Sequence, residues 1–276
     1  MGNMCSGDSD AGTDMSLHRR KRKGAGVGHH HDDDIDRIEE DRHYINPFQS
    51  NENRNGHKTF TWPDGSVYTG NWEDNLFHGH GEFKHANGDR FEGNFVYGKA
   101  EGKGTYTHQD GNVYEGDWRN DLQHGRGRET KPDGSVYNGE FYMGKKHGQG
   151  VYEWADGSKY DGSWRDNMKD GYGIYTWSDG SYYKGSFSEN KMHGKGFFDW
   201  CNGKTYEGDF YNDKKQGIGI FRWPKGVRYV GGWFENEKHG IGSIYLNDKE
   251  RRGEWQNGKR VRWLDDDEDM DDYQID

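Results

Sequence analysis

The chain has few aliphatic residues and no long apolar run. Leu, Ile, Val and Phe together make up only 36 of its 276 residues, and its formal net charge is −11. This composition by itself is typical of chains that cannot bury enough apolar surface to fold. Because no stretch of 18 apolar residues is present, we expect no transmembrane helix. We also expect no secretory signal, since no apolar segment follows the N-terminus.

Cysteine is scarce, and the net negative charge comes entirely from the two ends of the chain. Cys5 and Cys201 lie in unrelated contexts and predict no disulfide framework. Residues 51–264 carry 31 basic and 31 acidic side chains, whereas residues 265–276 carry eight acids and no base. A neutral central region gives no overall electrostatic reason to bind nucleic acid, so we expect no nucleic-acid partner.

Aromatic residues and glycine are abundant, with 11 Trp, 18 Tyr, 13 Phe and 44 Gly. A Tyr or Phe recurs every 23 residues without insertion or deletion, and it opens the pattern aromatic-x-Gly-x-aromatic. Two more glycines follow 11 and 13 residues later. A fixed period of this length indicates a repeat architecture, so the recurring residues build the repeat. The opening aromatics are Tyr68, Phe91, Tyr114, Tyr137, Tyr160, Tyr183, Tyr206 and Tyr229.

Within a repeat the pattern has a period of two, which is typical of β-strands. Tyr68, Gly70 and Trp72 fall on one face of such a strand. Asp-Gly or Asn-Gly dipeptides stand between repeats and predict tight type I′ turns, giving about seventeen antiparallel strands. An aromatic ring lying across a glycine of the neighbouring strand would cover the bare backbone there.

The expected fold class is all-β, an elongated single-sheet antiparallel array of β-hairpin repeats with disordered termini. Residues 1–54 are predicted to form a disordered N-terminal arm, and residues 55–262 the array of eight full repeats with degenerate ends. Residues 263–276 are predicted to be an acidic disordered tail. Atypical terminal repeats are expected because the last face of an array has no neighbour to cover it.

The unit Tyr-x-Gly-x-Trp…His-Gly-x-Gly…Asp-Gly resembles the MORN (membrane occupation and recognition nexus) repeat over about residues 55–260. The resemblance implies a MORN solenoid that acts as a scaffold and not as an enzyme. MORN proteins occur at plasma-membrane contact sites, in cytoskeletal collars and ciliary radial spokes, and as non-catalytic parts of lipid kinases and methyltransferases. Some bind phospholipid, some hold a partner helix, and several dimerise, so the family implies protein partners and allows a homodimer.

Departures from the repeat are the places to seek function. The aromatic 15 residues after the opening one is replaced by Glu129 in the third repeat. The residue two positions further on is His85, His108 or Lys131 in early repeats and Trp in the later ones. We favour the Trp half for protein binding, the alternative being that these rings only pack on their own sheet. The candidates are Trp154, Trp177, Trp200 and Trp223.

The N-terminal sequence predicts attachment to a membrane. Met1 to Ser6 match the N-myristoylation pattern, with Gly2 as acceptor and Cys5 placed for palmitoylation. One acyl chain binds membranes only marginally, so a second signal is needed. A basic run could supply it, adding about 1 kcal/mol per residue at an anionic leaflet, or could instead be a nuclear localisation signal. The run is Arg19, Arg20, Lys21, Arg22 and Lys23.

No sequence motif predicts catalysis, a cofactor or a metal site. Gly-x-Ser-x-Gly, His-Glu-x-x-His and Cys-x-x-Cys motifs are missing from the sequence. The recurring His residues stand one per repeat, about 10 Å apart by strand spacing, which is too far to share one ion. His29–His31 beside three Asp could bind a transition metal, and Asn46–Phe48 resembles the tripeptide that EH domains recognise. For the histidine segment a solvated polar tract is the commoner interpretation, and for Asn46–Phe48 a turn that leads into the repeats.

Three functional hypotheses follow. The favoured one is a non-enzymatic, lipid-anchored scaffold at the cytosolic face of a membrane. The second is a cytoskeletal or axonemal component, of a radial spoke or basal body for instance. The third is an accessory subunit of a separate enzyme.

Overall fold

The computed structural model describes residues 53–247 and 249–265. The predicted lipidation and basic residues, Gly2, Cys5 and Arg19 to Lys23, lie outside this part of the chain. The described residues form two compact bodies. The N-terminal body holds those up to Asp156 together with Ser163–Met168, and the C-terminal body holds Gly157–Gly162 and those from Lys169 onward. The predicted boundaries at 54/55 and 262/263 stay predictions.

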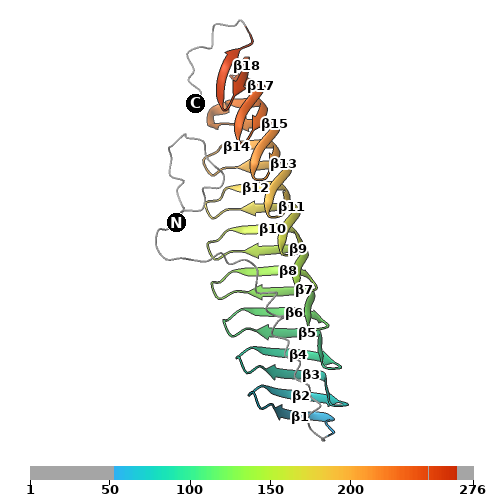
Figure 1. Ribbon diagram of the computed structural model, residues 1–276. Helices are drawn as coiled ribbons and strands as arrows, with labels where there is room; N and C mark the ends of the chain where they lie inside the picture. The colour runs from blue at the N-terminus through green and yellow to red at the C-terminus, as the bar shows by residue number, and fades with distance from the viewer. Residues whose placement is uncertain (1–52, 248, 266–276) are drawn as a thin grey trace. The chain divides into compact units, whose positions relative to one another are not determined.

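In the N-terminal body each strand pairs antiparallel with the next one along the chain (Figure 1). Seven-residue strands alternate with nine-residue strands, and each such pair is one hairpin. The strands are β1 (Gly56–Thr61), β2 (Val67–Glu73), β3 (Leu76–Lys84), β4 (Arg90–Val96), β5 (Lys99–Thr107), β6 (Val113–Arg119), β7 (Leu122–Thr130), β8 (Val136–Tyr142) and β9 (Lys145–Glu153).

The C-terminal body repeats the same antiparallel pairing in sequence order. A 3₁₀ turn, η2 (Pro224–Gly226), lies between two of its strands, and β10 (Lys159–Arg165) is divided between the two bodies. The other strands are β11 (Met168–Thr176), β12 (Tyr182–Ser188), β13 (Lys191–Asp199), β14 (Thr205–Tyr211), β15 (Lys214–Arg222), β16 (Arg228–Phe234), β17 (Glu237–Leu246), β18 (Lys249–Gln256) and β19 (Lys259–Trp263).

The predicted all-β antiparallel fold class is confirmed, and no α-helix occurs among residues 53–247 and 249–265. The strands of the described part of the chain number 19 and not about seventeen. The difference arises at the C-terminal end, where the degenerate repeat still folds as the hairpin β18–β19. In that part of the chain there is also no helix long and apolar enough to cross a membrane.

The core of each repeat consists of aromatic rings on one face of its strands. Within β12, Tyr183 is fully buried and Phe187 is 6 % exposed, with Gly185 on the same face, while Lys184 and Ser186 lie on the other face. The Tyr183 hydroxyl donates to the carbonyl of Ser186 at 2.9 Å, so the buried polar atom is satisfied. The opening Tyr residues that are fully buried are Tyr68, Tyr137, Tyr160, Tyr183, Tyr206 and Tyr229.

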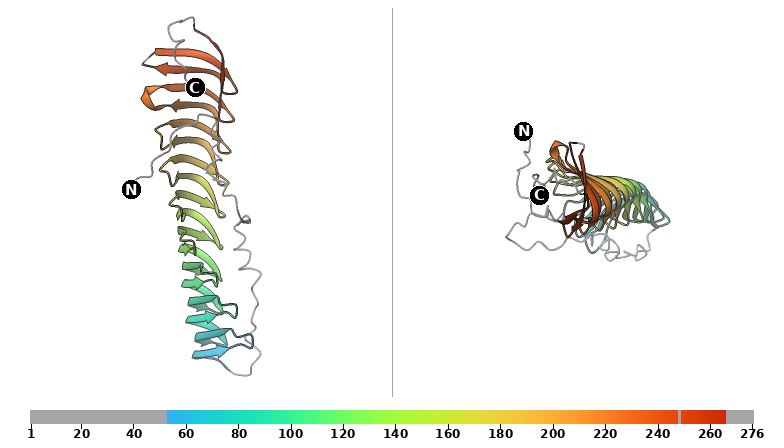
Figure 2. Two further views of the ribbon diagram at one scale, coloured as in Figure 1. Left: turned by 90° about the vertical axis from the view of Figure 1, so that its left-hand side faces the viewer. Right: turned by 90° about the horizontal axis from the view of Figure 1, so that it is seen from above.

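The predicted covering of strand glycines by a ring is confirmed. Gly185 and Gly196 face each other across β12 and β13, and the ring of Tyr183 lies over both. A Cβ on Gly185 would lie 2.7 Å from Gly196 Cα and only 2.4 Å from the Tyr183 hydroxyl oxygen. No side chain fits there. The strands curve along their length in both views of Figure 2, and glycine in a strand is the residue that commonly allows such bending.

The turn type predicted for the Asp-Gly dipeptides is wrong. At Asp64-Gly65 only the glycine has positive φ, +94°, and Gly65 N donates to Trp62 O at 3.0 Å. This is a type I turn followed by a left-handed residue, and Asp64 stabilises it by accepting from Ser66 N at 2.9 Å. The two-residue turns with positive φ at both positions lie at the other end of the hairpins, as at Glu189 and Asn190.

Candidate interaction surface

The four tryptophans proposed as partner contacts each stand directly after a strand, at the start of a turn. Trp154 follows β9, while Trp177, Trp200 and Trp223 follow β11, β13 and β15. All four side chains are half-buried. Trp154 belongs to the N-terminal body, where its ring lies 4.5 Å from that of Tyr152.

In the C-terminal body the Trp rings alternate with Phe rings from one repeat to the next. Trp200 stacks on Phe198 with ring centroids 4.2 Å apart, and it lies 5.6 Å from Phe221. Trp177 lies 4.9 Å from Phe198, and Trp223 lies 4.5 Å from Phe221. These rings therefore do pack on their own sheet, as the alternative interpretation had it, yet each keeps part of its surface exposed. Their role in partner binding stays a prediction.

A second set of side chains, which the sequence interpretation missed, joins this aromatic face. The ninth residue after the opening aromatic is Phe77, Ala100 or Gln123 in the first three repeats. Later repeats place Lys or Met there. Comparing the repeats position by position would have revealed the change. The residues are Lys146, Lys169, Met192, Lys215 and Lys238.

Lys215 lies in a cage of rings. Its ammonium nitrogen is 4.4 Å from the ring centre of Trp233, 4.9 Å from Phe221, 5.7 Å from Tyr206 and 5.8 Å from Trp200. Cation–π attraction favours a charged ammonium at such distances. The neighbouring positions are similar, since Lys238 lies over Trp223 at 5.1 Å and Lys169 over Tyr175 at 4.6 Å.

Burial and, to a smaller extent, the nearby positive charges of Lys238 and Lys204 together lower the pKa of Lys215 to about 7. The residue as a whole is only half-buried, but its ammonium lies among rings, and the surroundings of the ammonium decide the pKa. No carboxylate of the described residues forms an ion pair with Lys215. The C-terminal body therefore presents a cationic, aromatic surface that we call the Lys215 surface, formed by the half-buried residues Trp200, Lys204, Lys215, Trp223 and Lys238 above the buried ring of Trp233.

The N-terminal body neutralises its corresponding lysine. Lys146 Nζ lies 2.6 Å from Glu129 Oε2, and the two side chains are only 8 % and 22 % exposed. Glu129 is the acidic residue that replaces an aromatic in the third repeat. The replacement of an aromatic by Glu129 is thus matched by the Lys146 cation of the following repeat, and both members of this ion pair belong to the N-terminal body.

The recurring histidines have a structural role. His193 packs against the ring of Tyr211 at 5.1 Å, and His78 against Tyr97 at 5.3 Å. Where another residue replaces the histidine, as Gln216 does, its side chain accepts a hydrogen bond from the next turn, here from Glu235 N at 3.2 Å. Within residues 53–247 and 249–265 no three His, Cys, Asp or Glu side chains are placed to hold a metal ion.

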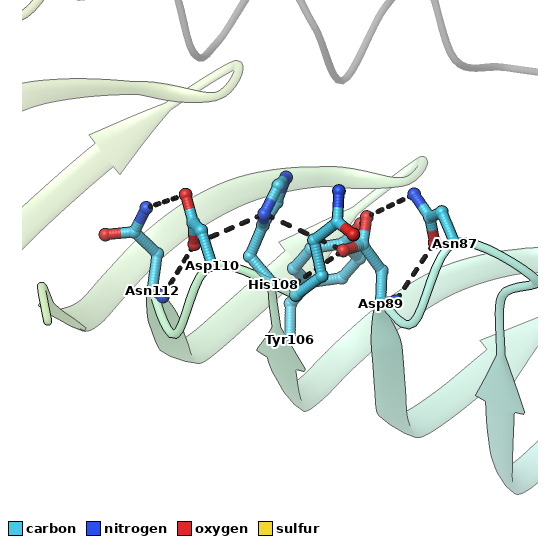
Figure 3. A network of polar contacts seen from close by, with 7 residues as sticks. Asn87, Asp89, Tyr106, His108, Asp110 and Asn112 are labelled. Atoms are coloured by element: carbon cyan, nitrogen blue, oxygen red, sulfur yellow. Dashed lines mark hydrogen bonds and ion pairs between the residues drawn. The ribbon is translucent and has the colours of Figure 1, made fainter.

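Polar contacts replace Trp at the turns of the early repeats (Figure 3). The carboxylate of Asp89, 5 % exposed, accepts from the Tyr106 hydroxyl at 2.7 Å, from Gln109 N at 2.8 Å and from Asn87 Nδ2 at 3.0 Å. His108 Nδ1 lies 3.7 Å from Asp89 Oδ1. Burial opposes ionisation of Asp89, but these hydrogen bonds outweigh it and hold the pKa of that carboxyl below its usual value.

Asp89→Asn should lower the free energy of unfolding by about 1–3 kcal/mol, because an amide cannot accept all three hydrogen bonds of the carboxylate. Asp110→Asn is the control, since Asn87 already fills the equivalent place one repeat earlier. This control substitution should change the free energy of unfolding by less than about 0.5 kcal/mol. Urea unfolding between pH 3 and 7 measures both. A lowered carboxyl pKa stabilises above the unfolded pKa, so the difference should vanish as pH falls through the folded pKa. Equal losses in the two variants would contradict the assignment.

The geometry defines a class: a β-hairpin repeat protein whose recurring residues build the sheet and whose variable positions form surfaces. The chain belongs to the MORN repeat family, since the family model for the MORN repeat matches residues 53–261 without a gap. Its full-length matches begin at the opening aromatics, residues 68, 91, 114, 137, 160, 183, 206 and 229. MORN repeats form scaffolds without catalytic groups of their own. No curated protein matches the chain.

Several solved structures are similar at low identity. One is the TCP10 domain of Danio rerio CPAP in complex with a peptide of Danio rerio STIL, 10 % identical over 76 % of this chain and 94 % of that chain, with a TM-score of 0.44. Another is the SAS-4 (dCPAP) TCP domain of Drosophila melanogaster in complex with a proline-rich motif of Ana2 (dSTIL), 12 % identical over 64 % and 90 %, with a TM-score of 0.36. Likenesses at this level carry no argument about function.

Proposed function

We propose that this protein is a MORN scaffold tethered to the cytosolic face of a membrane, where its repeats position partner proteins without catalysing a reaction. The observation that carries the proposal is the acylation sequence Met1 to Ser6 in the same chain as a gap-free MORN array. Gly2 is the myristate acceptor and Cys5 the palmitate acceptor.

The basic run from Arg19 to Lys23 completes the anchor. A single myristoyl chain holds a protein to a membrane only marginally and reversibly. Five basic residues at an anionic leaflet add about 1 kcal/mol each at most, and salt weakens their contribution. Stable anchoring therefore needs the acyl signal together with the basic run, so loss of the acyl acceptor releases the protein and loss of the basic run weakens its attachment.

The later repeats supply the contacts with partners. Trp177, Trp200 and Trp223 combine packing against their own sheet with an exposed part. Rigid, partly exposed aromatic side chains are the type that contributes most to protein interfaces. Lys215 and Lys238 among them add positive charge, which favours partner segments that carry acidic residues.

The test is fractionation of the full chain, tagged at its C-terminus, into soluble, detergent-soluble and detergent-insoluble material. The wild type should float with membranes, and Gly2→Ala should become soluble. A variant with Arg19 to Lys23 changed to Gln should be released at lower salt than the wild type. Asn3→Ala, which leaves the acceptor glycine intact, is the control and should stay with the membrane.

The alternatives give different results. Retention of wild type and Gly2→Ala alike in the detergent-insoluble cytoskeleton would replace the proposal with a cytoskeletal or ciliary structural role. An enzyme activity that co-purifies with a second polypeptide would make the chain an accessory subunit. Light scattering of the purified chain measures whether it forms the homodimer that several members of the family form.

A further inference from the structure

The ammonium of Lys215, at the centre of the Lys215 surface, has no carboxylate partner among the residues that the structure describes. Lys204, Lys215 and Lys238 lie near enough to one another to affect the Lys215 ammonium, and rings surround that ammonium on several sides. The matching lysine of the N-terminal body, Lys146, meets the Glu129 carboxylate at 2.6 Å. Lys215 has no such partner among residues 53–247 and 249–265. A desolvated ammonium without a counter-ion is unfavourable, so a ligand that brings a carboxylate would gain an interaction there.

We propose that the Lys215 surface binds an acidic segment, and that the segment is this chain's own C-terminal tail, residues 266–276. Seven of these eleven residues are Asp or Glu, and none is basic. Met270, Tyr273 and Ile275 are interspersed among the acids. The tail therefore combines carboxylates for the lysines with apolar side chains for the exposed parts of Trp200 and Trp223. This assigns an occupant to the surface and goes beyond the proposed scaffold function.

The length of the tail decides which lysines it can contact. At about 3.3 Å per residue, eleven residues extend up to about 36 Å beyond Asp265. Strands lie about 4.8 Å apart, so β17 with Lys238 and β15 with Lys215 are about 10 and 19 Å from β19. Lys169 on β11 is about 38 Å away by the same measure. Lys215 and Lys238 are therefore within reach of the middle of the tail, whereas Lys169 is not.

Attachment in the same chain favours this occupant over a free acidic peptide. A short tether to the same chain gives an effective concentration of about millimolar, so even weak contacts suffice for occupancy. Charge-assisted hydrogen bonds from ammonium to carboxylate are the stronger kind, and they are strengthened where water is displaced by rings. An acidic partner protein would then have to compete with the tail for the Lys215 surface.

Zero-length carbodiimide cross-linking of the full chain tests the contact, because this reagent joins a carboxylate to an amine that touches it, forming an amide with loss of water. Mass spectrometry should find the tail linked to Lys215 or Lys238 and not to Lys169. Mixing ¹⁴N- and ¹⁵N-labelled chains should give cross-linked peptides of a single isotope. Peptides that combine both isotopes would show that a second copy supplies the tail, which overturns the intramolecular proposal.

Matched variants separate the tail contact from a folding defect. Lys215→Met should abolish the cross-link to residue 215 and leave the fold intact, because Met192 fills the same place one repeat earlier. Lys169→Met is the control and should leave every tail cross-link unchanged. In a chain whose tail acids are changed to Asn and Gln, a synthetic peptide of residues 265–276 should bind, and Lys215→Met should weaken that binding about tenfold or more.

Two results would overturn the proposal. One is that the peptide, at millimolar concentration, does not bind the tail-neutralised chain, although the circular dichroism spectrum of that chain is the same as that of the wild type. The other is equal binding to the Lys215→Met and Lys169→Met forms of that chain. Loss of binding with rising salt, together with no binding of an Asn/Gln version of the peptide, is the expected signature of a carboxylate–ammonium contact.

Discussion

Gly196→Ala is expected to lower the free energy of unfolding by about 3 kcal/mol, although it adds a single methyl group. A Cβ at this position would lie 2.4 Å from Cε2 and from the hydroxyl oxygen of Tyr183, a ring that is fully buried. The ring cannot swing away without opening the core of its repeat. Gly196 does not have positive φ, so the loss comes from the collision alone.

The control for this substitution is Gly180→Ala, in a turn of the same body. Gly180 has a φ of +87° with no atom within 4 Å of the added Cβ, so only backbone strain of about 1 kcal/mol is expected. In a Tyr183→Ala background, Gly196→Ala should add little further loss, since the colliding ring is gone. Urea unfolding of the four variants measures the coupling. A loss from Gly196→Ala that persists without the Tyr183 ring would contradict the assignment.

Lys169→Met is expected to raise the free energy of unfolding by about 2 kcal/mol at pH 7. Burial lowers the pKa of Lys169 to about 8, while the charge of Asp213 acts in the opposite direction. The unfolded lysine has a pKa of about 10.4. Between these two values the unfolded chain binds more protons, so the wild type gains stability as the pH rises. Below pH 8 the folded protein buries a charged ammonium, which lowers its free energy of unfolding by the full amount. Substitution by methionine removes this unfavourable contribution.

The stability difference between Lys169→Met and wild type should therefore be constant below pH 8 and should narrow between pH 8 and about 10.4. Urea unfolding at a series of pH values measures it. Met192, 5 % exposed in the next repeat, shows that methionine fits this place. Lys191→Met, at an exposed site, is the control and should stay within about 0.5 kcal/mol of wild type at every pH. A difference that does not depend on pH would exclude the ammonium as its cause.

Much of the fold could be predicted because the determining interactions are local and repeat every 23 residues. The alternation of Tyr183, Gly185 and Phe187 sets the face of a strand, and the spacing to Gly196 sets which backbone the ring covers. The turn type could not be read in the same way. Asp-Gly suits several turns, and the hydrogen bonds between Trp62, Gly65 and Ser66 select one of them.

The candidate surface was predicted only in part. The sequence located Trp177, Trp200 and Trp223 as departures from the earlier repeats, but it could not show that Phe198 and Phe221 of their own sheet cover much of each ring. The lysines went unnoticed because Lys at one position of a polar chain is ordinary. Its significance depends on which rings surround the ammonium.

The sequence by itself determined the repeat, its β-strands, the glycines beneath the rings and the family, because each depends on residues close together in the chain. Only the tertiary structure decided how charge is balanced across repeats. Lys146 meets Glu129 from the preceding repeat, whereas Lys215 meets the rings of Phe221 and Trp233. The physical reason is that desolvation and pairing of a charge depend on neighbours brought together by strand pairing, which the spacing of one residue type does not specify.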